Sequence, residues 1–397
     1  MMAYKHQFKT CVLVTATVCF ALCGLDVRGE ELIVNGGFES YTGMVGHSGN
    51  WDPISSNLSL DGWACGWENG AVGLTKDSGT WVKSGIGVVD GSYALYFQKV
   101  SSITQTINVA MAGSLEISFS YVARPNSSDY YRNGVIHVEV DGVEIGAVNC
   151  STNYDNFLEA RFAAPIGAGR HAFVIRHDPS NNANACSAID AVSVNATSNL
   201  VLNGGFELGT VGSNHSGNWA ATTETGFENP HWNWNDGSMG LAKPGSAWAA
   251  STISGADTYM MYFQTVNCTY KGVERKQEAA SLWQSFEVTQ PGVYELAFSH
   301  ARRTGGYKDG TIRARVYEGS GTGGAVKGEF TVATVNKTAF DEFSGTVKLL
   351  APGTYTLEFY APQPEYNPTT LNEADSIIDN VSFSLRRTRC GLAIRFL

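Results

Sequence analysis

The chain has 397 residues, of which 43% are hydrophobic, and its formal net charge is −10. An acidic chain with no basic stretch before its C-terminal end is poorly suited to bind a polyanion, so we expect no nucleic-acid partner. Beyond the first 29 residues, no stretch reaches the roughly 18 apolar residues of a membrane helix, so we expect no membrane span.

The first 29 residues have the pattern of a secretory signal peptide. Lys5 and Lys9 form a short basic region, and Cys11–Leu22 is apolar and uncharged. A run of this length suits a signal peptide and is too short to cross a bilayer. The residues before Glu30 permit cleavage after Gly29, and cleavage after Gly24 is the alternative. We therefore expect a secreted or cell-surface protein; the other interpretation is an apolar leader that stays attached.

Several later segments alternate between apolar and polar residues, as half-buried β strands do. The clearest are Leu115–Tyr121, Val135–Val140, Thr311–Tyr317 and Thr354–Phe359. Asp141-Gly142 follows the second of these segments and predicts a hairpin turn. No long stretch has the spacing of an amphipathic helix. Many short strands separated by Gly-containing turns predict an all-β fold made of antiparallel β-sandwiches of jelly-roll type.

An internal repeat is the strongest signal in the sequence. Residues 32–39 read LIVNGGFE and residues 200–207 read LVLNGGFE, and HSGNW occurs at 47–51 and again at 215–219. Further matches keep the same order: Trp67 with Trp234, Trp81 with Trp248, Gln98 with Gln264, Gln105 with Gln284, Arg124 with Arg303, Tyr131 with Tyr307, and Asp190 with Asp379. A period this long predicts two tandem domains, at 30–197 and 198–384, and not a solenoid. A basic tail at 385–397 is either a frayed end or a sorting signal.

Five cysteines follow the predicted leader: Cys65, Cys150, Cys186, Cys268 and Cys390. None belongs to a Cys-x-x-Cys pair, so a structural zinc site is not indicated. Cys150 and Cys186 lie in the same predicted domain and could form one disulfide in an oxidising compartment. The odd number leaves at least one thiol free in a monomer, which is the state we expect.

The repeated motifs resemble those of a known group of domains. The first strand with Asn35-Gly36-Gly37-Phe38-Glu39, a Gly–Trp region, a Tyr-Phe-Gln strand and a last strand with Ile-Asp-x-Val resemble galactose-binding-like jelly rolls. Within that group they resemble carbohydrate-binding modules of families four, nine and twenty-two. The tandem is also similar to a plant cell-wall protein family with two such domains. The resemblance covers nearly all of the chain after the leader, and it specifies the fold better than the ligand.

The resemblance also implies a structural calcium ion between the first and last strands of each domain. The matching residues are Glu39 and Asp190 in the first copy and Glu207 and Asp379 in the second. Calcium prefers carboxylate and carbonyl oxygens, so these side chains suit it chemically. The alternative is that the carboxylates only accept hydrogen bonds from backbone N–H groups at the strand ends.

Aromatic and polar side chains are the candidates for sugar contact, because a flat ring covers the C–H patches of a sugar and polar groups bind its hydroxyls. Trp63 and Trp232 lie in Gly- and Asn-rich loops, and Trp81 and Trp248 follow at matching intervals. Trp67 and Trp234 are expected in the core. The polar and phenolic candidates are Gln98, Arg124, Tyr131, Gln264, Arg303 and Tyr307. Each arginine could instead form a salt bridge within its domain, and each glutamine could complete a strand edge.

Enzyme signatures are absent from the sequence. It has no HExxH and no Gly-x-Ser-x-Gly, and His137-Val138-Glu139 is not followed by the cysteine pair of a zinc deaminase. Paired carboxylates that meet only in space cannot be recognised in this way. We expect a non-catalytic, polysaccharide-binding protein with one site in each repeat. The alternatives are a structural or adhesive surface protein and, less favoured, a polysaccharide lyase or hydrolase.

Overall fold

The computed structural model describes the chain from residue 30 to residue 386, with gaps. The described ranges are 30–42, 51–54, 59–67, 70–77, 80–125, 134–150, 155–179, 184–212, 217–235, 238–249, 253, 258–270, 273–277, 279–305, 308–367 and 373–386. Every regular element within them is a β strand, which confirms the all-β fold class. No helix in these ranges is long and apolar enough to cross a membrane. The predicted leader, at 1–29, and residues 387–397 of the predicted tail lie outside the described residues.

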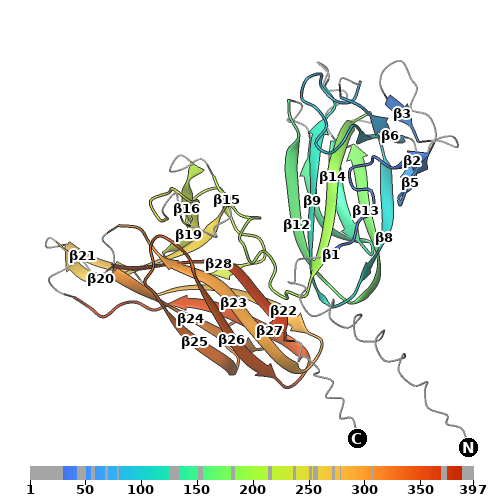
Figure 1. Ribbon diagram of the computed structural model, residues 1–397. Helices are drawn as coiled ribbons and strands as arrows, with labels where there is room; N and C mark the ends of the chain where they lie inside the picture. The colour runs from blue at the N-terminus through green and yellow to red at the C-terminus, as the bar shows by residue number, and fades with distance from the viewer. Residues whose placement is uncertain are drawn as a thin grey trace, which may run out of the picture.

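Two antiparallel sheets pack against each other in the first copy of the repeat (Figure 1). The larger sheet runs in spatial order through β12 (Leu158–Ile166), β9 (Gly113–Ala123), β14 (Cys186–Thr197), β7 (Ala94–Gln98), β6 (Ala71–Thr75) and β3 (Trp51–Pro53), with β1 (Glu30–Glu31) paired to β14. The smaller sheet runs through β11 (Val143–Asn149), β10 (Gly134–Val140), β13 (Gly169–Pro179), β8 (Ser101–Val109) and β5 (Ala64–Trp67). A short pair, β2 (Tyr41–Thr42) and β4 (Ser59–Leu60), stands apart from both sheets.

The second copy repeats this strand order. Its larger layer runs through β26 (Asp341–Leu349), β23 (Gly292–Arg302), β28 (Glu373–Leu385), β20 (Met260–Tyr270), β19 (Met239–Ala242) and β16 (Trp219–Ala221). Its smaller layer runs through β25 (Val326–Thr334), β24 (Lys308–Glu318), β27 (Gly353–Ala361), β22 (Ala280–Val288) and β18 (Asn233–Trp234). Two accessory elements are β21 (Val273–Gln277), which extends β20, and the pair β15 (Thr210–Val211) with β17 (Phe227–Glu228). A short parallel contact between β24 and β28 joins the two layers.

The predicted alternation of apolar and polar residues matches the alternation of buried and more exposed residues along these strands. Along β10, every second residue from Gly134 is buried and the residues between are half-buried. The strand then reverses at Asp141 and Gly142, whose φ angles of 51° and 76° both lie in the left-handed region. Such a pair is what a tight two-residue hairpin turn requires, because its twist matches that of the strands. The predicted hairpin between β10 and β11 is thereby confirmed.

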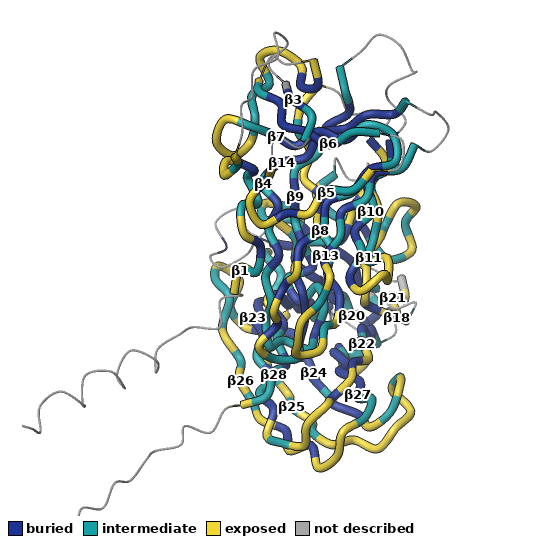
Figure 2. Tube along the Cα trace, turned by 90° about the vertical axis from the view of Figure 1, so that its right-hand side faces the viewer, coloured by how far each residue is buried: buried dark blue, intermediate teal, exposed yellow. Residues whose placement is uncertain are grey.

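Each copy buries a hydrophobic core of its own. The first core extends from Ile33 to Val194 and the second from Val201 to Phe383, and each draws residues from both layers of its copy. Figure 2 shows the buried residues along the strands and the exposed ones mainly at the turns. Both cores fall inside the ranges expected for the two domains, while the boundary at 197/198 stays a prediction.

The glycines of the NGGF motif let the opening segment of each copy touch the last strand. A Cβ atom on Gly36 would lie 1.9 Å from the Val192 carbonyl oxygen, and one on Gly204 would lie 2.0 Å from that of Val381. The contact is closed by hydrogen bonds from the Val192 N–H to the Gly36 carbonyl and from the Val381 N–H to the Gly204 carbonyl. Only glycine fits there, which explains why both copies keep the motif.

A buried glutamine ties the same segment to the smaller sheet. Gln105 of β8 accepts a hydrogen bond from the Val34 N–H at 2.8 Å and donates one to the Val34 carbonyl at 3.0 Å. Gln284 of β22 does the same with Leu202, at 2.7 and 2.9 Å. The side-chain amide thus satisfies both polar groups of one backbone residue, as a neighbouring strand would. The opening segment is therefore held between the two layers.

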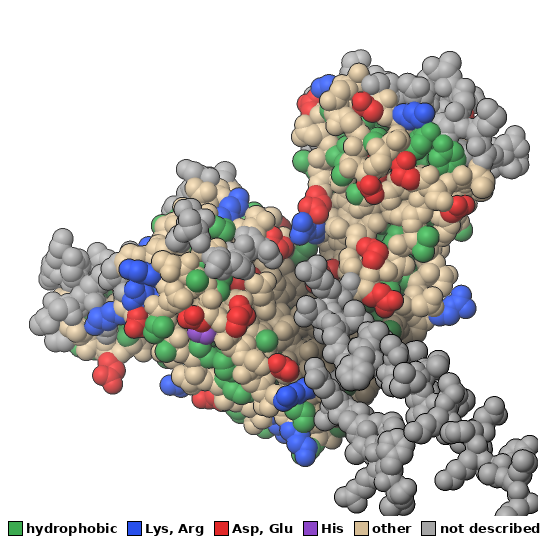
Figure 3. Space-filling view, in the orientation of Figure 1, with side chains coloured by type: hydrophobic (Ala, Val, Ile, Leu, Met, Phe, Trp, Pro, Cys, Tyr) green, Lys and Arg blue, Asp and Glu red, His purple; other side chains and the backbone are tan. Residues whose placement is uncertain are grey.

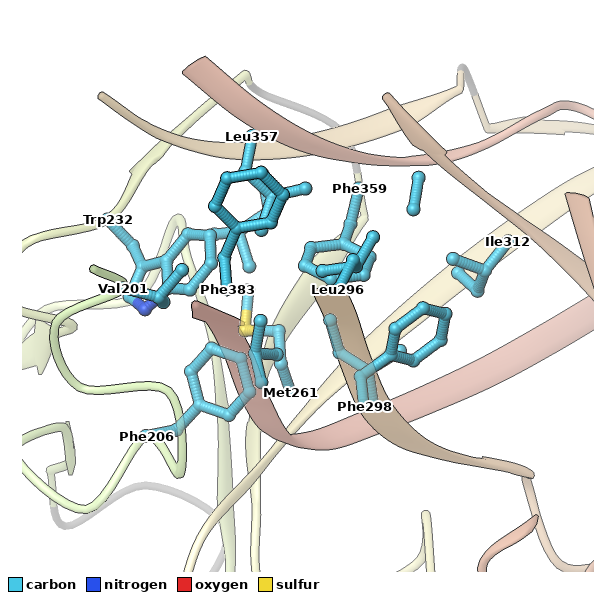
Figure 4. Packing of buried hydrophobic residues seen from close by; sticks show 14 of the residues in the cluster. Val201, Phe206, Trp232, Met261, Leu296, Phe298, Ile312, Leu357, Phe359 and Phe383 are labelled. Atoms are coloured by element: carbon cyan, nitrogen blue, oxygen red, sulfur yellow. The ribbon is translucent and has the colours of Figure 1, made fainter. Parts of the chain in front are cut away.

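Trp63 and Trp232 belong to the cores, so the expectation that they contact a ligand is wrong. Their side chains are 7% and 3% exposed, and each packs on the phenylalanine of the NGGF motif. Their indole N–H groups donate to the carbonyls of Asn35 and Asn203, both at 3.0 Å. Figure 4 shows Trp232 at one side of the second core. The Gly- and Asn-rich loops that carry these residues turn inward, and composition alone could not predict that direction.

Replacing Trp63 or Trp232 by Ala should destabilise the fold strongly. Removal of a buried tryptophan leaves a cavity and typically costs about 3–5 kcal/mol. The measurement is the free energy of unfolding in denaturant for the full chain. Trp67→Ala is the matched control, because the Trp67 side chain is 48% exposed. A loss at Trp63 no larger than the loss at Trp67 would contradict its place in the core.

Candidate functional site

The four carboxylates predicted to hold calcium lie where the opening segment meets the last strand. Asp190 sits at a bulge in β14; its Oδ2 accepts the N–H groups of Val89 and Asp90, and its Oδ1 that of Ala191. Glu39 Oε1 accepts two further N–H groups from the following turn, at 2.7 Å each. Burial, together with the nearby charge of Asp90, raises the pKa of Asp190 to about 6.

The second copy shows a similar use of these carboxylates. Asp379 Oδ1 accepts the Asn380 N–H at 2.8 Å, and Glu207 Oε1 accepts the Tyr259 N–H at 2.7 Å. Within the described residues, no group of three or more metal-ligating side chains is assembled. The observed hydrogen bonds correspond to the alternative in which these carboxylates accept backbone N–H groups. Calcium therefore stays a prediction.

Trp81 forms the middle layer of a stack in the first copy. Its ring lies parallel to that of Tyr96, with centroids 4.0 Å apart and an interplanar angle of 7°. The Arg124 guanidinium lies 4.4 Å from the centroid of the Trp81 ring. A ring has two faces, so Tyr96 and Arg124 take one each. Trp81 is 3% exposed and belongs to a hydrophobic cluster on the outer side of the larger sheet.

The same stack occurs in the second copy. Trp248 lies 3.7 Å from Tyr262 at an angle of 12°, and the Arg303 guanidinium is 4.0 Å from the Trp248 centroid. Trp248 is also 3% exposed. The expectation that Trp81 and Trp248 offer a ring face to a sugar is therefore wrong, because both faces are already covered. What the copies share at these positions is packing of a loop onto the sheet.

The polar groups at the outer end of the stack differ between the copies. Arg303 Nη1 donates to Asp375 Oδ2 at 3.0 Å and to Glu373 Oε1 at 3.2 Å, and the Gln264 amide also donates to Glu373. The salt-bridge interpretation of Arg303 is thus the one realised. Burial, followed by the charge of Glu373, raises the pKa of Asp375 to about 7.

Cys186 takes the place of Asp375 in the first copy. Strand pairing sets Gln98 opposite Cys186 and Gln264 opposite Asp375, and Arg124 Nη1 lies 3.9 Å from the Cys186 sulfur. The disulfide that Cys150 and Cys186 could form is absent, because both thiols are free. Cys186 packs on the outer side of the larger sheet and Cys150 packs in the core, so the sheet separates them.

The expected pairing of Trp67 with Trp234 is also wrong. In β5, Cys65 is opposite Ile103, and in β18, Trp234 is opposite Leu282. Ile103 lies two residues before Gln105, and Leu282 lies two residues before Gln284. Trp234 of the second copy therefore corresponds to Cys65 of the first. Trp67 is half exposed, contrary to the expected core position, and Trp234 packs partly buried against the second core. Tyr131 and Tyr307 lie outside the described residues.

The outer face of the smaller layer in the second copy carries a set of side chains that the sequence interpretation missed. We call it the Trp283 face and define it by Trp283, Arg313, Arg315, Glu358 and Tyr360. Strand register places Trp283, Glu358 and Arg315 side by side on β22, β27 and β24, and Tyr360 beside Arg313 in the adjacent row. The buried neighbours Leu282 and Gln284 point inward, so Trp283 points outward.

Hydrogen bonds hold the polar members of this face in place. The Glu358 carboxylate accepts from the Ser281 hydroxyl at 2.5 Å and from the Tyr317 hydroxyl at 2.7 Å. Arg315 Nη1 lies 3.8 Å from Glu358, while its Nε donates to Glu329 at 2.8 Å. The Arg315 guanidinium also lies 5.1 Å from the centroid of the Tyr360 ring. Such a network presents donors and acceptors in fixed directions.

Trp283 itself is half-buried and has no ring contact among the described residues. Of the tryptophans whose side chains are described, only Trp67 shares this property. A signal for Trp283 did exist in the sequence. It stands at an outward position of an alternating strand, and Thr104 stands at its place in the first copy, so the shared fold does not require it.

The corresponding face of the first copy is different. Register places Thr104, Val174 and Glu139 where the second copy has Trp283, Glu358 and Arg315. His137 stands at the place of Arg313 and pairs with Glu144 at 2.8 Å. A shallow depression of about 420 Å³ is lined by Val34, Gly62, Ala64, Thr104, Gln105 and Thr106. The two copies therefore share a fold and differ in this surface.

No protein-family model and no curated protein matches the sequence. Among solved structures, the tandem domain CBM22-1–CBM22-2 of Xyn10C from Paenibacillus barcinonensis is 13% identical, with 91% of this chain and 100% of that chain covered and a TM-score of 0.28. The module TmCBM61, in complex with β-1,4-galactotriose, is 17% identical, with 47% and 99% covered and a TM-score of 0.29. A cyclase from Fischerella sp. TAU is 10% identical, with 42% and 96% covered and a TM-score of 0.31. Matching structures are mostly carbohydrate-binding modules, and all of these scores are low.

Replacing Asp375 by Asn should change how stability depends on pH. The pKa of Asp375 is about 7 in the folded protein and about 3.9 in an unfolded chain. Because the folded state holds this proton more tightly, the group stabilises the fold below about pH 4, and this contribution is lost as the pH rises through about 7. The Tm of the wild type should therefore fall, relative to that of Asp375→Asn, between these two pH values.

Thermal unfolding of both proteins across this pH range is the measurement. Asp155→Asn is the control, since that side chain is exposed. Parallel curves of Tm against pH for the wild type and Asp375→Asn would show that folding does not raise the pKa of Asp375.

Proposed function

We propose that this chain is a non-catalytic carbohydrate-binding protein and that a glycan lies across the Trp283 face. The observation that carries the proposal is Trp283, an outward tryptophan without a ring partner among the described residues and beside fixed polar groups. In a fold whose described tryptophans otherwise mostly pack on rings, a half-buried indole on a strand surface is available to a ligand.

The chemistry of the face suits a sugar. An indole ring covers the C–H patch of a pyranose, and the groups beside it meet the hydroxyls. Glu358 offers acceptor oxygens, while Arg315 offers donors on the neighbouring strand. Since Glu358 and Arg315 are already oriented by hydrogen bonds, little side-chain freedom would be lost when a ligand binds.

The contacts of Glu358 support binding over catalysis. Its carboxylate accepts hydrogen bonds from Ser281 and Tyr317 and lies near Arg315, so its role in this network is that of an acceptor. Glycoside hydrolysis needs two carboxyl groups on either side of the scissile bond, one of which donates a proton. The other carboxylate of this row, Glu329, is bonded to Arg315. A structural or adhesive protein without a sugar site remains the alternative.

We propose a second, weaker site in the first copy, at the depression lined by Val34, Ala64, Thr104 and Thr106. Its two threonine hydroxyls and apolar floor would receive a smaller part of a sugar than the Trp283 face does. Two weak sites on one chain gain avidity for a polymer through effective concentration. Secretion or display at the cell surface, where polysaccharides occur, accords with the pattern of the first 29 residues.

Replacing Trp283 by Ala should weaken retention of the full chain on insoluble polysaccharide by about thirtyfold or more, because a tryptophan at the centre of an interface is worth about 2 kcal/mol or more. The melting temperature should change little, since the ring points away from the core. The measurement is affinity electrophoresis and pull-down on a panel of cell-wall polysaccharides, with reducing-end release followed in parallel.

Trp67→Ala is the matched control, because it removes an exposed tryptophan of the first copy. Adding Ala64→Arg to Trp283→Ala should abolish the residual binding by filling the depression. Unchanged retention of Trp283→Ala would remove the Trp283 face from the proposal. New reducing ends or unsaturated products would show that the protein is an enzyme.

Calcium should raise the Tm if the carboxylates Glu39 and Asp190, and Glu207 and Asp379, hold the proposed ion. A cation would offset the crowding of Asp190 and Asp90, which contributes to the raised pKa of Asp190. An ion that binds only the folded state stabilises it by mass action. The measurement is thermal unfolding with calcium and with chelator, using the double variant Asp190→Asn, Asp379→Asn as the control that should abolish the difference. Identical curves would leave the carboxylates as acceptors of backbone N–H groups only.

A further inference from the structure

Arg313 is the polar side chain of the Trp283 face that the described structure leaves least satisfied. Its Nε is buried and has no hydrogen-bond partner, and the residue forms none of the ion pairs found among the described residues. A buried charged donor without a partner is costly, and in native proteins it calls for a ligand or another specific explanation. The residue as a whole is half-buried, so part of the guanidinium faces the surface.

The neighbours of Arg313 do not neutralise it. Strand register sets it between Tyr360 on β27 and Thr331 on β25, and neither is acidic. The two carboxylates of the adjacent row, Glu329 and Glu358, are bound to Arg315, Ser281 and Tyr317. The positive charge of Arg313 is therefore available on this face.

The first copy handles the same position in the opposite way. His137 replaces Arg313 there, and its ring nitrogen pairs with Glu144 Oε2 at 2.8 Å. The fold therefore does not need an unpaired cation at this point of β10 or β24. A feature that the shared architecture does not require and that is costly to bury points to a ligand.

We infer that the Trp283 face selects acidic glycans, with Arg313 binding the carboxylate of a uronic acid residue near the sugar on Trp283. This inference rests on the proposed function. Guanidinium and carboxylate groups match as planar forks and form two parallel charge-assisted hydrogen bonds. Trp283 and Arg313 stand two strands and one row apart, about 10 Å across the sheet and about 7 Å along it, which a few linked sugars span.

The charge of the whole chain makes this selectivity specific to the site. The net charge is −10, and Figure 3 shows Lys and Arg side chains scattered over the visible face without a broad basic patch. A polyanion therefore gains no general attraction from the protein. Any preference for an acidic polymer over its neutral counterpart must come from a local cation.

The test compares polygalacturonate and glucuronoxylan with the same polymers after chemical reduction of their carboxyl groups. The wild type should bind at least one acidic polymer about tenfold or more tightly than its reduced form, since a hydrogen bond to a charged group is worth about 1.5–3 kcal/mol. Arg313→Gln should lose that preference and keep the affinity for the reduced polymer. Arg313→Lys keeps the charge but lacks the two parallel donors of a guanidinium, so it should lose most of the preference for the acidic polymer.

Arg170→Gln is the control for charge, because Arg170 is exposed on the first copy. The Tm of Arg313→Gln should equal or exceed that of the wild type, since a buried donor without a partner is removed. Absence of an acidic preference in the wild type, or its survival in Arg313→Gln, overturns the inference. Tighter binding to a sulfated neutral polymer than to either uronate polymer overturns the choice of carboxylate. Trp283→Ala separates the two proposals, because it should weaken binding to acidic and reduced polymers alike. Normal binding by this variant would refute stacking of a sugar on Trp283, and a loss of acidic preference in Arg313→Gln would then still assign the carboxylate to Arg313.

Discussion

The opening segment of each copy is held between the two layers, and the rest of the sandwich depends on that constraint. Gly36 lies against the last strand of the larger sheet, where a Cβ atom would meet the Val192 carbonyl at 1.9 Å. Gln105 binds both backbone groups of Val34 from the smaller sheet. Since these contacts join residues far apart in the chain, they form only when both layers are in place. Trp63 packs beside them in the core, with its indole N–H bonded to the Asn35 carbonyl. The pattern recurs around Gly204 and Gln284.

This constraint explains which parts of the fold the sequence could predict. The glycines of the NGGF motif and the paired glutamines recur in both copies. Gly36 and Gly204 leave room for the last strand, and Gln105 and Gln284 bind the backbone of the opening segment. The alternation of apolar and polar residues along the strands and the Asp141-Gly142 turn depend on residues close together in the chain, so the sequence predicts them as well. The direction of the loop that carries Trp63 depends on where the opening segment lies, which is a long-range contact. Composition favoured an exposed Trp63 and a buried Trp67, and the structure has the reverse.

The candidate site has no signature that the two copies share. The residues that they do share, Trp81, Arg124, Trp248 and Arg303, mark packing, because the two tryptophan rings are stacked and buried. Trp283 has no counterpart in the first copy, so a comparison of the repeats passes over it. In a duplicated domain, residues kept in both copies include those the fold requires, whereas an aromatic residue at an outward position in one copy only is free of that requirement.

Two arginines of the second copy lie in contrasting environments, and the contrast supports the proposed place of binding. Arg303 lies on Trp248 and donates to Asp375 and Glu373, so the burial of its charge is compensated within the protein. Arg313 has no such compensation, since its Nε is buried without a partner in the described structure. Proteins retain uncompensated polar groups mainly where function requires them. The Arg303 cluster therefore serves the fold, whereas Arg313 lies on the same surface as Trp283, where the exposed part of its guanidinium would meet the proposed anion.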